Sequence, residues 1–132
     1  MKEESRKLLD KGRRALKAAE TLLREGDAEF AAGRAYYAML HTAQSLLREK
    51  GLQYRRHSGV HAAFGEHFAK TGLLDRKYHR WLLDAFDERL RGDYDFQTSF
   101  DTESVAVWIA QAREFWEVAE RLLKEGRGMA RD

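Results

Sequence analysis

The spacing of apolar residues constrains the fold of this chain most strongly. They recur at steps of three and four residues along five segments, and no segment alternates apolar and polar residues over a strand's length. Steps of three and four residues keep apolar side chains on one face of a helix, whereas a half-buried strand needs apolar and polar residues to alternate. Proline is absent, and Ala, Leu, Arg and Glu dominate. The sequence therefore predicts an all-α protein whose amphipathic helices pack around one core.

Glycines and capping residues divide the chain into five expected helices. Gly26, Gly51 and Gly72 each follow a periodic segment, and Asp27 and Asp75 are suited to cap the next one. The expected helices cover residues 3–24, 28–50, 59–70, 76–91 and 102–124. Four are long and one is short, which predicts an antiparallel up-and-down four-helix bundle with one additional short helix. We expect residues 1–132 to form a single domain.

Composition excludes several classes of function. The 24 basic and 22 acidic residues give a net charge of +2, so charge alone does not imply a nucleic-acid partner. The absence of cysteine excludes disulfides and thiolate metal sites and fits a reducing compartment. No stretch is long and apolar enough to span a membrane, and the first ten residues lack the apolar core of a signal peptide. We expect a cytoplasmic protein without a membrane partner.

Histidines cluster after the second expected helix, at positions 57, 61 and 67. A metal site would need further ligands at compatible spacing, but no carboxylate completes a set and no HExxH pattern is present. We therefore expect no metal and no other cofactor.

Arg89 interrupts an apolar helical face. The residues that precede it on this face are Tyr78, Leu82, Ala85 and Phe86. Asp93 follows one turn later with Tyr94 beside it, and Gly92 is expected to end the helix between them. Arg89 and Asp93 could form only an ion pair at a helix end, worth a few tenths of a kcal/mol. They could equally belong to a functional site, and the residues alone leave both interpretations open.

Two other polar features could take part in binding. Helix 28–50 carries a second stripe that is too polar for a pure core, consisting of Phe30, Arg34, Tyr37, His41, Gln44 and Arg48. This stripe could face a partner subunit or a ligand groove, or be half-covered by a neighbouring helix. The loop that follows holds Arg55, Arg56 and His57. It is either simply solvated or part of a phosphate-binding surface.

Two runs of the sequence carry a resemblance to a known family. They read GRAYYAMLHTAQSLLREKGL and RRHSGVHAAFGEHFAKTGLLDRKYHRWLLDAFDERLRGDYDF, and they lie within residues 28–96. Together they resemble the HEPN (higher eukaryotes and prokaryotes nucleotide-binding) superfamily, in its small prokaryotic branch. This resemblance implies an all-α bundle that forms a two-fold dimer. It also implies a small nucleotidyltransferase as partner, because many relatives are encoded beside one as a toxin–antitoxin pair.

Active members of this superfamily are metal-independent endoribonucleases. Their signature is an Arg followed four to six residues later by a His, and the residue here that matches the Arg is Arg89. At the matching His positions this chain has Asp93, Tyr94 and Asp95. An Asp with a pKa near ~3.9 is a poor acid at neutral pH, and a Tyr with a pKa near ~10 is a poor base.

Two functions therefore remain open, and the missing His favours the first. In the first, the protein binds RNA or a nucleotide in a dimer cleft with degenerate catalysis and pairs with a nucleotidyltransferase. In the second, it is an endoribonuclease toxin in which Arg89, Asp93 and Tyr94 are catalytic. The residues expected to bind the ligand are Arg34, Tyr37, His41, Arg55, Arg56, His57 and Arg91. The resemblance also allows modification of Tyr94 by the partner protein.

Overall fold

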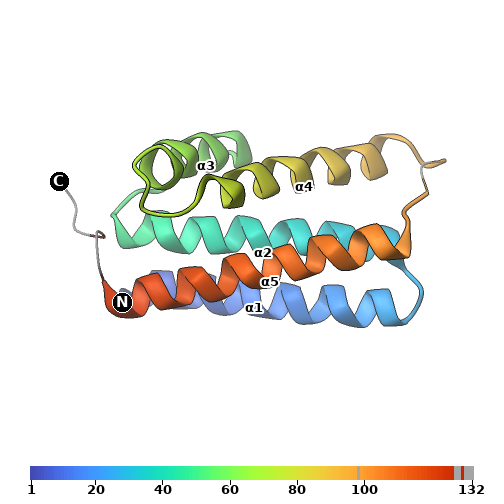
Figure 1. The fold of residues 1–132 in the computed structure, drawn as a ribbon, viewed down its shortest axis with the longest axis horizontal. Coiled ribbons are helices and arrows are strands. Elements are labelled where there is room, and N and C mark those ends of the chain that lie inside the picture. Colours follow the sequence, from blue (N-terminus) through green and yellow to red (C-terminus); the bar gives the residue numbers. More distant parts are fainter. Residues whose placement is uncertain (98, 127–128, 130–132) are drawn as a thin grey trace.

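The computed structural model describes residues 1–97, 99–126 and 129. Its helices are α1 (Glu3–Arg24), α2 (Ala28–Glu49), α3 (His57–Phe64), the π-helical turn η1 (Gly65–Ala69), α4 (Arg76–Tyr94) and α5 (Thr102–Glu125). The long helices alternate in direction, with α1 and α4 opposed to α2 and α5, and α3 lies beside the start of α4 (Figure 1). No strand occurs among the described residues. The predicted all-α bundle with one additional short helix is confirmed.

Helix α2 is the centre of the bundle and contacts α1, α3, α4 and α5. Small side chains make this possible, since Ala35, Ala38 and Ala43 are fully buried along it. Gly12 of α1 lies close to α2. A Cβ atom there would lie 3.1 Å from the Thr42 hydroxyl and 3.3 Å from the Ala38 carbonyl oxygen, so even a methyl group would require its neighbours to shift by a few tenths of an ångström.

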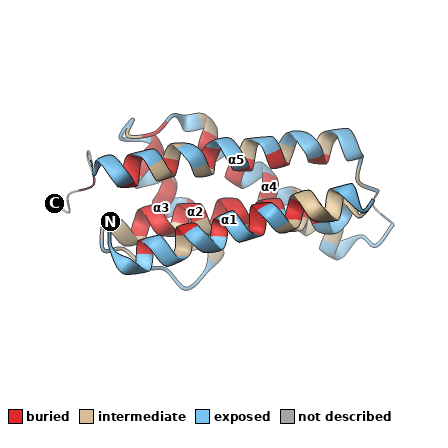
Figure 2. Cartoon of the chain, turned by 90° about the horizontal axis from the view of Figure 1, so that it is seen from below, coloured by how far each residue is buried: buried red, intermediate tan, exposed pale blue. Residues whose placement is uncertain are grey.

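Aromatic rings fill much of the core between these helices. Each long helix carries a buried stripe interrupted by exposed turns (Figure 2). The largest fully buried side chains include Tyr36, Phe64, Phe68 and Phe115. Phe115 of α5 packs against Phe64 of α3 with the ring centroids 5.2 Å apart, so the short helix shares the core of the bundle.

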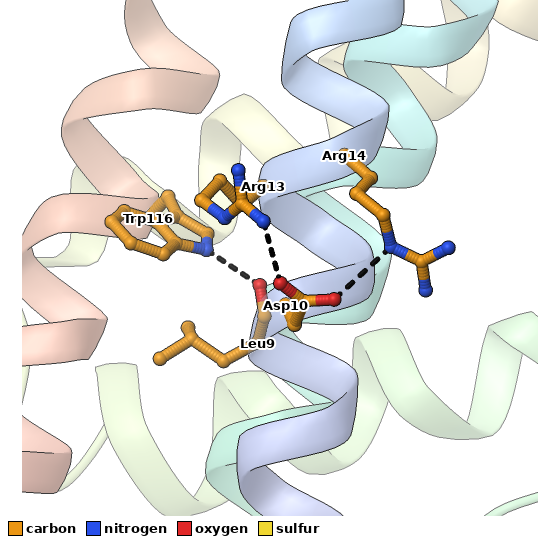
Figure 3. Close-up of polar contacts among 5 residues, drawn as sticks. All are labelled: Leu9, Asp10, Arg13, Arg14 and Trp116. Carbon is orange, nitrogen blue, oxygen red and sulfur yellow. Dashed lines mark hydrogen bonds and ion pairs between the residues drawn. The ribbon is translucent and has the colours of Figure 1, made fainter.

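A partly buried hydrogen bond joins α5 to α1. The indole Nε1 of Trp116 donates to the Leu9 carbonyl oxygen at 2.7 Å (Figure 3). In the same region Asp10 accepts hydrogen bonds from Arg13 at 2.7 Å and from Arg14 at 3.1 Å. The two arginine pairs are solvent-exposed and contribute little to stability. The indole bond, in contrast, fixes how α5 sits on α1.

The predicted end of helix 76–91 is wrong, because α4 continues through Gly92 to Tyr94. Gly92 does not end the helix, and its lack of a side chain allows a close contact. A Cβ atom at this position would lie 2.9 Å from the Phe100 ring, which packs over the end of α4. This tertiary contact overrides the weak helix propensity of glycine.

The short helix also differs from its predicted range of 59–70. It begins at His57, with Arg56 as the N-cap residue. Its second half is the π-helical turn η1, in which the Lys70 amide donates to the Gly65 carbonyl oxygen at 2.8 Å. None of the described helices is both long and apolar enough to cross a membrane.

Candidate functional site

Arg89 lies where α4 packs against α2. Its guanidinium carbon is 4.9 Å from the centroid of the Tyr37 ring and 5.7 Å from that of the Tyr36 ring. The Arg89 side chain keeps 26% of its surface exposed. The apolar face that carries it is anchored by Tyr78, Leu82 and Ala85, all of which are buried. Arg89 therefore rests on two aromatic rings and still reaches solvent.

A hollow of about 180 Å³ opens beside Arg89, between the first half of α2 and the end of α4. Its lining consists of Glu29, Phe30, Gly33, Arg34, Tyr37, Arg89, Gly92, Asp93 and Phe100. Arg89 forms an ion pair with Asp93 across 3.5 Å. The ion pair suggested by their spacing is thus present, and it lies within the wall of a hollow.

Arg34 adds a second cation to the hollow. Its guanidinium carbon is 4.7 Å from the centroid of the Tyr37 ring, so Tyr37 contacts both arginines of the lining. Arg34 is exposed and forms no ion pair with the described carboxylates. Of the two arginines, Arg34 keeps its charge uncompensated, while Arg89 shares its charge with Asp93.

A buried tyrosine connects Arg89 to two histidines of α3. Tyr36 is completely buried, and its hydroxyl lies 2.8 Å from His61 Nε2 and 3.2 Å from His57 Nδ1. Burial raises the pKa of Tyr36, against the opposing charge of Arg89, so the phenol stays protonated. A phenol has one proton, so it donates to one imidazole and accepts from the other.

Both imidazoles are uncharged at neutral pH. Burial lowers the pKa of His61 to about 4, with smaller contributions from His57 and His79. The pKa of His57 is lowered first by burial and then by the charge of Arg89. His57 therefore lies beside the Tyr37 ring as a neutral hydrogen-bonding group and not as a cation for phosphate.

Close packing of α4 on α3 holds these histidines in place. A Cβ atom at Gly65 would lie 2.6 Å from the His79 ring, so only glycine leaves room for that ring. His79 Nε2 hydrogen-bonds the His61 carbonyl oxygen at 3.0 Å. The Phe86 ring then lies 4.9 Å from the His61 ring, which closes the cluster against the core.

The remaining predicted residues divide into two groups. His41 lies near the site, with its ring 5.9 Å from the Tyr37 ring, and its Nδ1–H donates to the Gln44 side-chain oxygen at 2.9 Å. Burial is the main cause that lowers its pKa. Arg55 and Arg56 are exposed in the loop before α3 and make no ion pair within the described chain.

Two predicted residues at the end of α4 do not line the hollow. Arg91 pairs with Glu88 and lies over the Phe100 ring at 5.0 Å. Tyr94 is 84% exposed and makes no contact with Arg89 among the described interactions. The structure thus brings Arg34, Tyr37, Arg89 and Asp93 together and leaves Tyr94 outside the group.

Sequence reasoning missed Tyr36 and the part that His61 plays. His61 was considered only as a metal ligand, although its four-residue spacing from His57 puts both on one helical face. That spacing is the signal that could have found the pair. Within the described part of the chain, no group of three or more His, Asp or Glu side chains is arranged to hold a metal ion.

A larger hollow of about 330 Å³ lies at the opposite end of α2, against α1 and the following loop. Leu8, Leu47 and Val60 contribute apolar surface to it. Its Arg48 lies 3.8 Å from Glu4. The smaller hollow is the better candidate for a functional site, because two arginines meet an aromatic ring there next to the histidine cluster.

Comparison with known proteins identifies the family. The family model described as the HEPN domain matches residues 5–127. The chain belongs to the HEPN family. The membership predicted from residues 28–96 is therefore confirmed and extends over nearly the whole chain.

Curated relatives of this HEPN chain come from bacteria and archaea. A UPF0332 protein of Thermotoga maritima is 35% identical over 115 residues, covering 87% of each chain. A UPF0332 protein of Gloeobacter violaceus is 35% identical over 126 residues, covering 95% of this chain and all of the relative. A Methanocaldococcus jannaschii protein that bears the name "Putative toxin" is 32% identical over 125 residues, covering 95% and 92% of the two chains.

Proposed function

We propose that this HEPN protein binds RNA through the hollow beside Arg89 and acts as a toxin-like component of a paired system. The observation that carries the proposal is Arg89 itself, which stacks on Tyr37 and remains partly open to solvent next to Arg34. A guanidinium offers a planar fork of donors that matches phosphate oxygens. Exposed aromatic rings beside such cations suit the bases of a single strand.

The toxin-like role is supported by the name of the Methanocaldococcus jannaschii relative. A toxin of this kind needs a neutralising partner, and the resemblance described above points to a small nucleotidyltransferase. The reading frame beside the gene for this chain tests that part of the proposal. A neighbour without any nucleotidyltransferase motif would count against the pairing.

We expect Asp93 and Tyr94 to support at most very weak cleavage. The Asp93 carboxylate is held in an ion pair with Arg89, at 3.5 Å, and is not free to exchange a proton with a substrate. Tyr94 projects into solvent away from the described contacts of Arg89. The substitution of the usual His by these residues therefore favours binding over chemistry at this end of α4.

We also propose a homodimer formed through α4 and the polar stripe of α2. Three large apolar side chains are exposed in this region, with exposed fractions of 62% for Phe30, 84% for Tyr94 and 90% for Phe96. A partner subunit would remove them from water. Sedimentation should show a dimer that Phe30→Glu weakens. A monomer at micromolar concentrations, or a dimer that buries α1 and α5 instead, would contradict this arrangement.

RNA binding should depend on salt and on the loop before α3. Replacing Arg55 and Arg56 by Ala removes two exposed cations, so affinity for single-stranded RNA should fall to a similar extent across sequences. The slope of log K against log salt should decrease by roughly 1.4, at about 0.7 per phosphate contact. The matched control is Arg13→Ala with Arg14→Ala, which removes the same charge from α1. Equal loss in the two double variants would mean that the loop is not part of the site.

A further inference from the structure

We infer that His57 is the group that removes the 2′-hydroxyl proton of an RNA bound at Arg89, and that Tyr36 positions its ring for this step. The inference rests on the proposed RNA binding and assigns the proton carrier that the end of α4 lacks. It names a residue from α3, outside the stretch in which the family signature lies.

The first support is the shared position of His57 and Arg89. The His57 ring centroid is 5.9 Å from the centroids of both Tyr36 and Tyr37. The Arg89 guanidinium carbon is 5.7 Å and 4.9 Å from the same two rings. His57 is only half-buried, at the first turn of α3. A base and a phosphate-binding cation therefore flank one pair of aromatic rings.

The second support is the hydrogen bonding of Tyr36. Its hydroxyl is closer to His61 Nε2, at 2.8 Å, than to His57 Nδ1, at 3.2 Å. When the phenol donates its single proton to His61, its oxygen accepts from His57 Nδ1–H. This assignment leaves the lone pair on His57 Nε2, which makes no hydrogen bond with the described residues. Tyr36 thereby selects the tautomer that can act as a base.

The protonation state of His57 agrees with its role as a base. Burial and the charge of Arg89 lower the pKa of His57, so the imidazole is the free base at neutral pH. A base needs its proton-accepting form populated at the working pH. The buried Tyr36 oxygen can accept from Nδ1–H in both states of the ring, so the contact survives when Nε2 takes up a proton.

The chemical step is an internal transesterification of RNA. His57 Nε2 takes the proton of the 2′-hydroxyl, and the 2′-oxygen forms a bond to the adjacent phosphorus. The bond from phosphorus to the 5′-oxygen breaks, and this oxygen keeps the electron pair and takes a proton from water. The products are a 2′,3′-cyclic phosphate and a 5′-hydroxyl, and His57 returns its proton to solvent. Arg89 stabilises the additional negative charge on the phosphate in the transition state.

The test compares cleavage and binding of one single-stranded RNA in chelator. The parent should release a 2′,3′-cyclic phosphate, and His57→Ala should slow cleavage by about 10²–10⁴-fold, also when the rates are compared at saturating RNA, so that a change in affinity does not account for the loss. Added imidazole should restore part of the rate. His67→Ala, in which a partly buried histidine of η1 outside the Tyr36 cluster is removed, is the matched control and should cleave like the parent. RNA with a 2′-deoxy nucleotide should bind without being cut.

Further variants separate a chemical role from a structural one. Tyr36→Phe should shift the pH–rate profile, because His57 then loses the partner that selects its tautomer. His57→Gln, checked by circular dichroism, replaces His57→Ala if the latter fails to fold. The inference is overturned if the parent binds RNA without cleaving it, or if His57→Ala cleaves at the parent rate. RNA binding at Arg89 stands in both cases, whereas a parent that does not bind RNA removes the proposed function and this inference together.

Discussion

Replacing Arg89 by Ala is expected to weaken binding of single-stranded RNA by at least about tenfold. A hydrogen bond to a charged group contributes roughly 1.5–3 kcal/mol, and each 1.4 kcal/mol corresponds to about a factor of ten in affinity. Arg89 lies in the hollow with its guanidinium stacked on Tyr37, so little conformational freedom is lost when it binds phosphate. Fluorescence anisotropy with a labelled RNA measures the change.

Two further variants sharpen this prediction. Arg89→Lys keeps the charge but loses the planar fork and the stacking, so its affinity should lie between those of the parent and Arg89→Ala. Arg113→Ala is the matched control, because Arg113 of α5 pairs with Glu20 of α1 away from the hollow. If folded Arg89→Ala binds RNA as tightly as the parent, the pair of Arg89 and Asp93 is only an ion pair at the end of a helix.

The sequence predicted the position of Arg89 because helical periodicity determines which face a residue shares. Arg89 follows a buried apolar stripe at the regular spacing, and the structure places it half-buried against α2. The same periodicity predicted the helices themselves. These features depend on residues close together in the chain, so a single segment contains the information needed to predict them.

The histidine cluster could not be predicted in this way. Tyr36 meets His57 and His61 across separations of 21 and 25 residues, so the contact depends on how α3 is placed over α2. That placement depends in turn on Gly65, which admits the His79 ring. Glycine in a helix predicts weakness when it is considered alone. At Gly65 and Gly92, however, the absence of a side chain lets an aromatic ring pack closely against the helix. The contact at Gly92 explains why the predicted end of α4 was wrong.

The family was predicted from the resemblance to the HEPN superfamily, because helical periodicity and capping residues do not distinguish one helical family from another. The comparisons confirm the family, whereas the dimer, the nucleotidyltransferase partner and the roles of the site residues remain predictions. The structure adds one chemical group near the site. It places a neutral His57 near Arg89, whereas the sequence pattern points for a proton carrier only to residues 93–95.

The stability of the protein should fall sharply as the pH drops from about 6.5 to about 4. His61 is almost completely buried with its Nε2 against the Tyr36 hydroxyl, and burial lowers its pKa from 6.5 to about 4. Between these values the unfolded chain binds a proton at this position and the folded chain does not. The free energy of unfolding therefore decreases as the pH falls through this window and increases again as it rises.

The expected loss for His61 is on the order of 2–3 kcal/mol, since one unit of pKa shift corresponds to about 1.4 kcal/mol. His57 and His41 have lowered pKa values and act in the same direction. Asp10 and Glu114 also have lowered pKa values, each because of hydrogen-bonded basic side chains. The stability they contribute is lost only below their unfolded values of 3.8 and 4.5, near the lower end of the window.

Urea unfolding of the parent and His61→Gln at several pH values tests this account. The Gln amide can still hydrogen-bond the Tyr36 hydroxyl but does not titrate, so the variant should lose much less stability between pH 6.5 and pH 4. His67→Gln is the control, because that histidine lies on η1 beside Glu66, outside the Tyr36 cluster, and the variant should lose stability with falling pH as the parent does. If His61→Gln loses as much stability between pH 6.5 and pH 4 as the parent, burial of His61 is not the cause of the loss. The loss would then have to come from His57, His41 or the carboxylates.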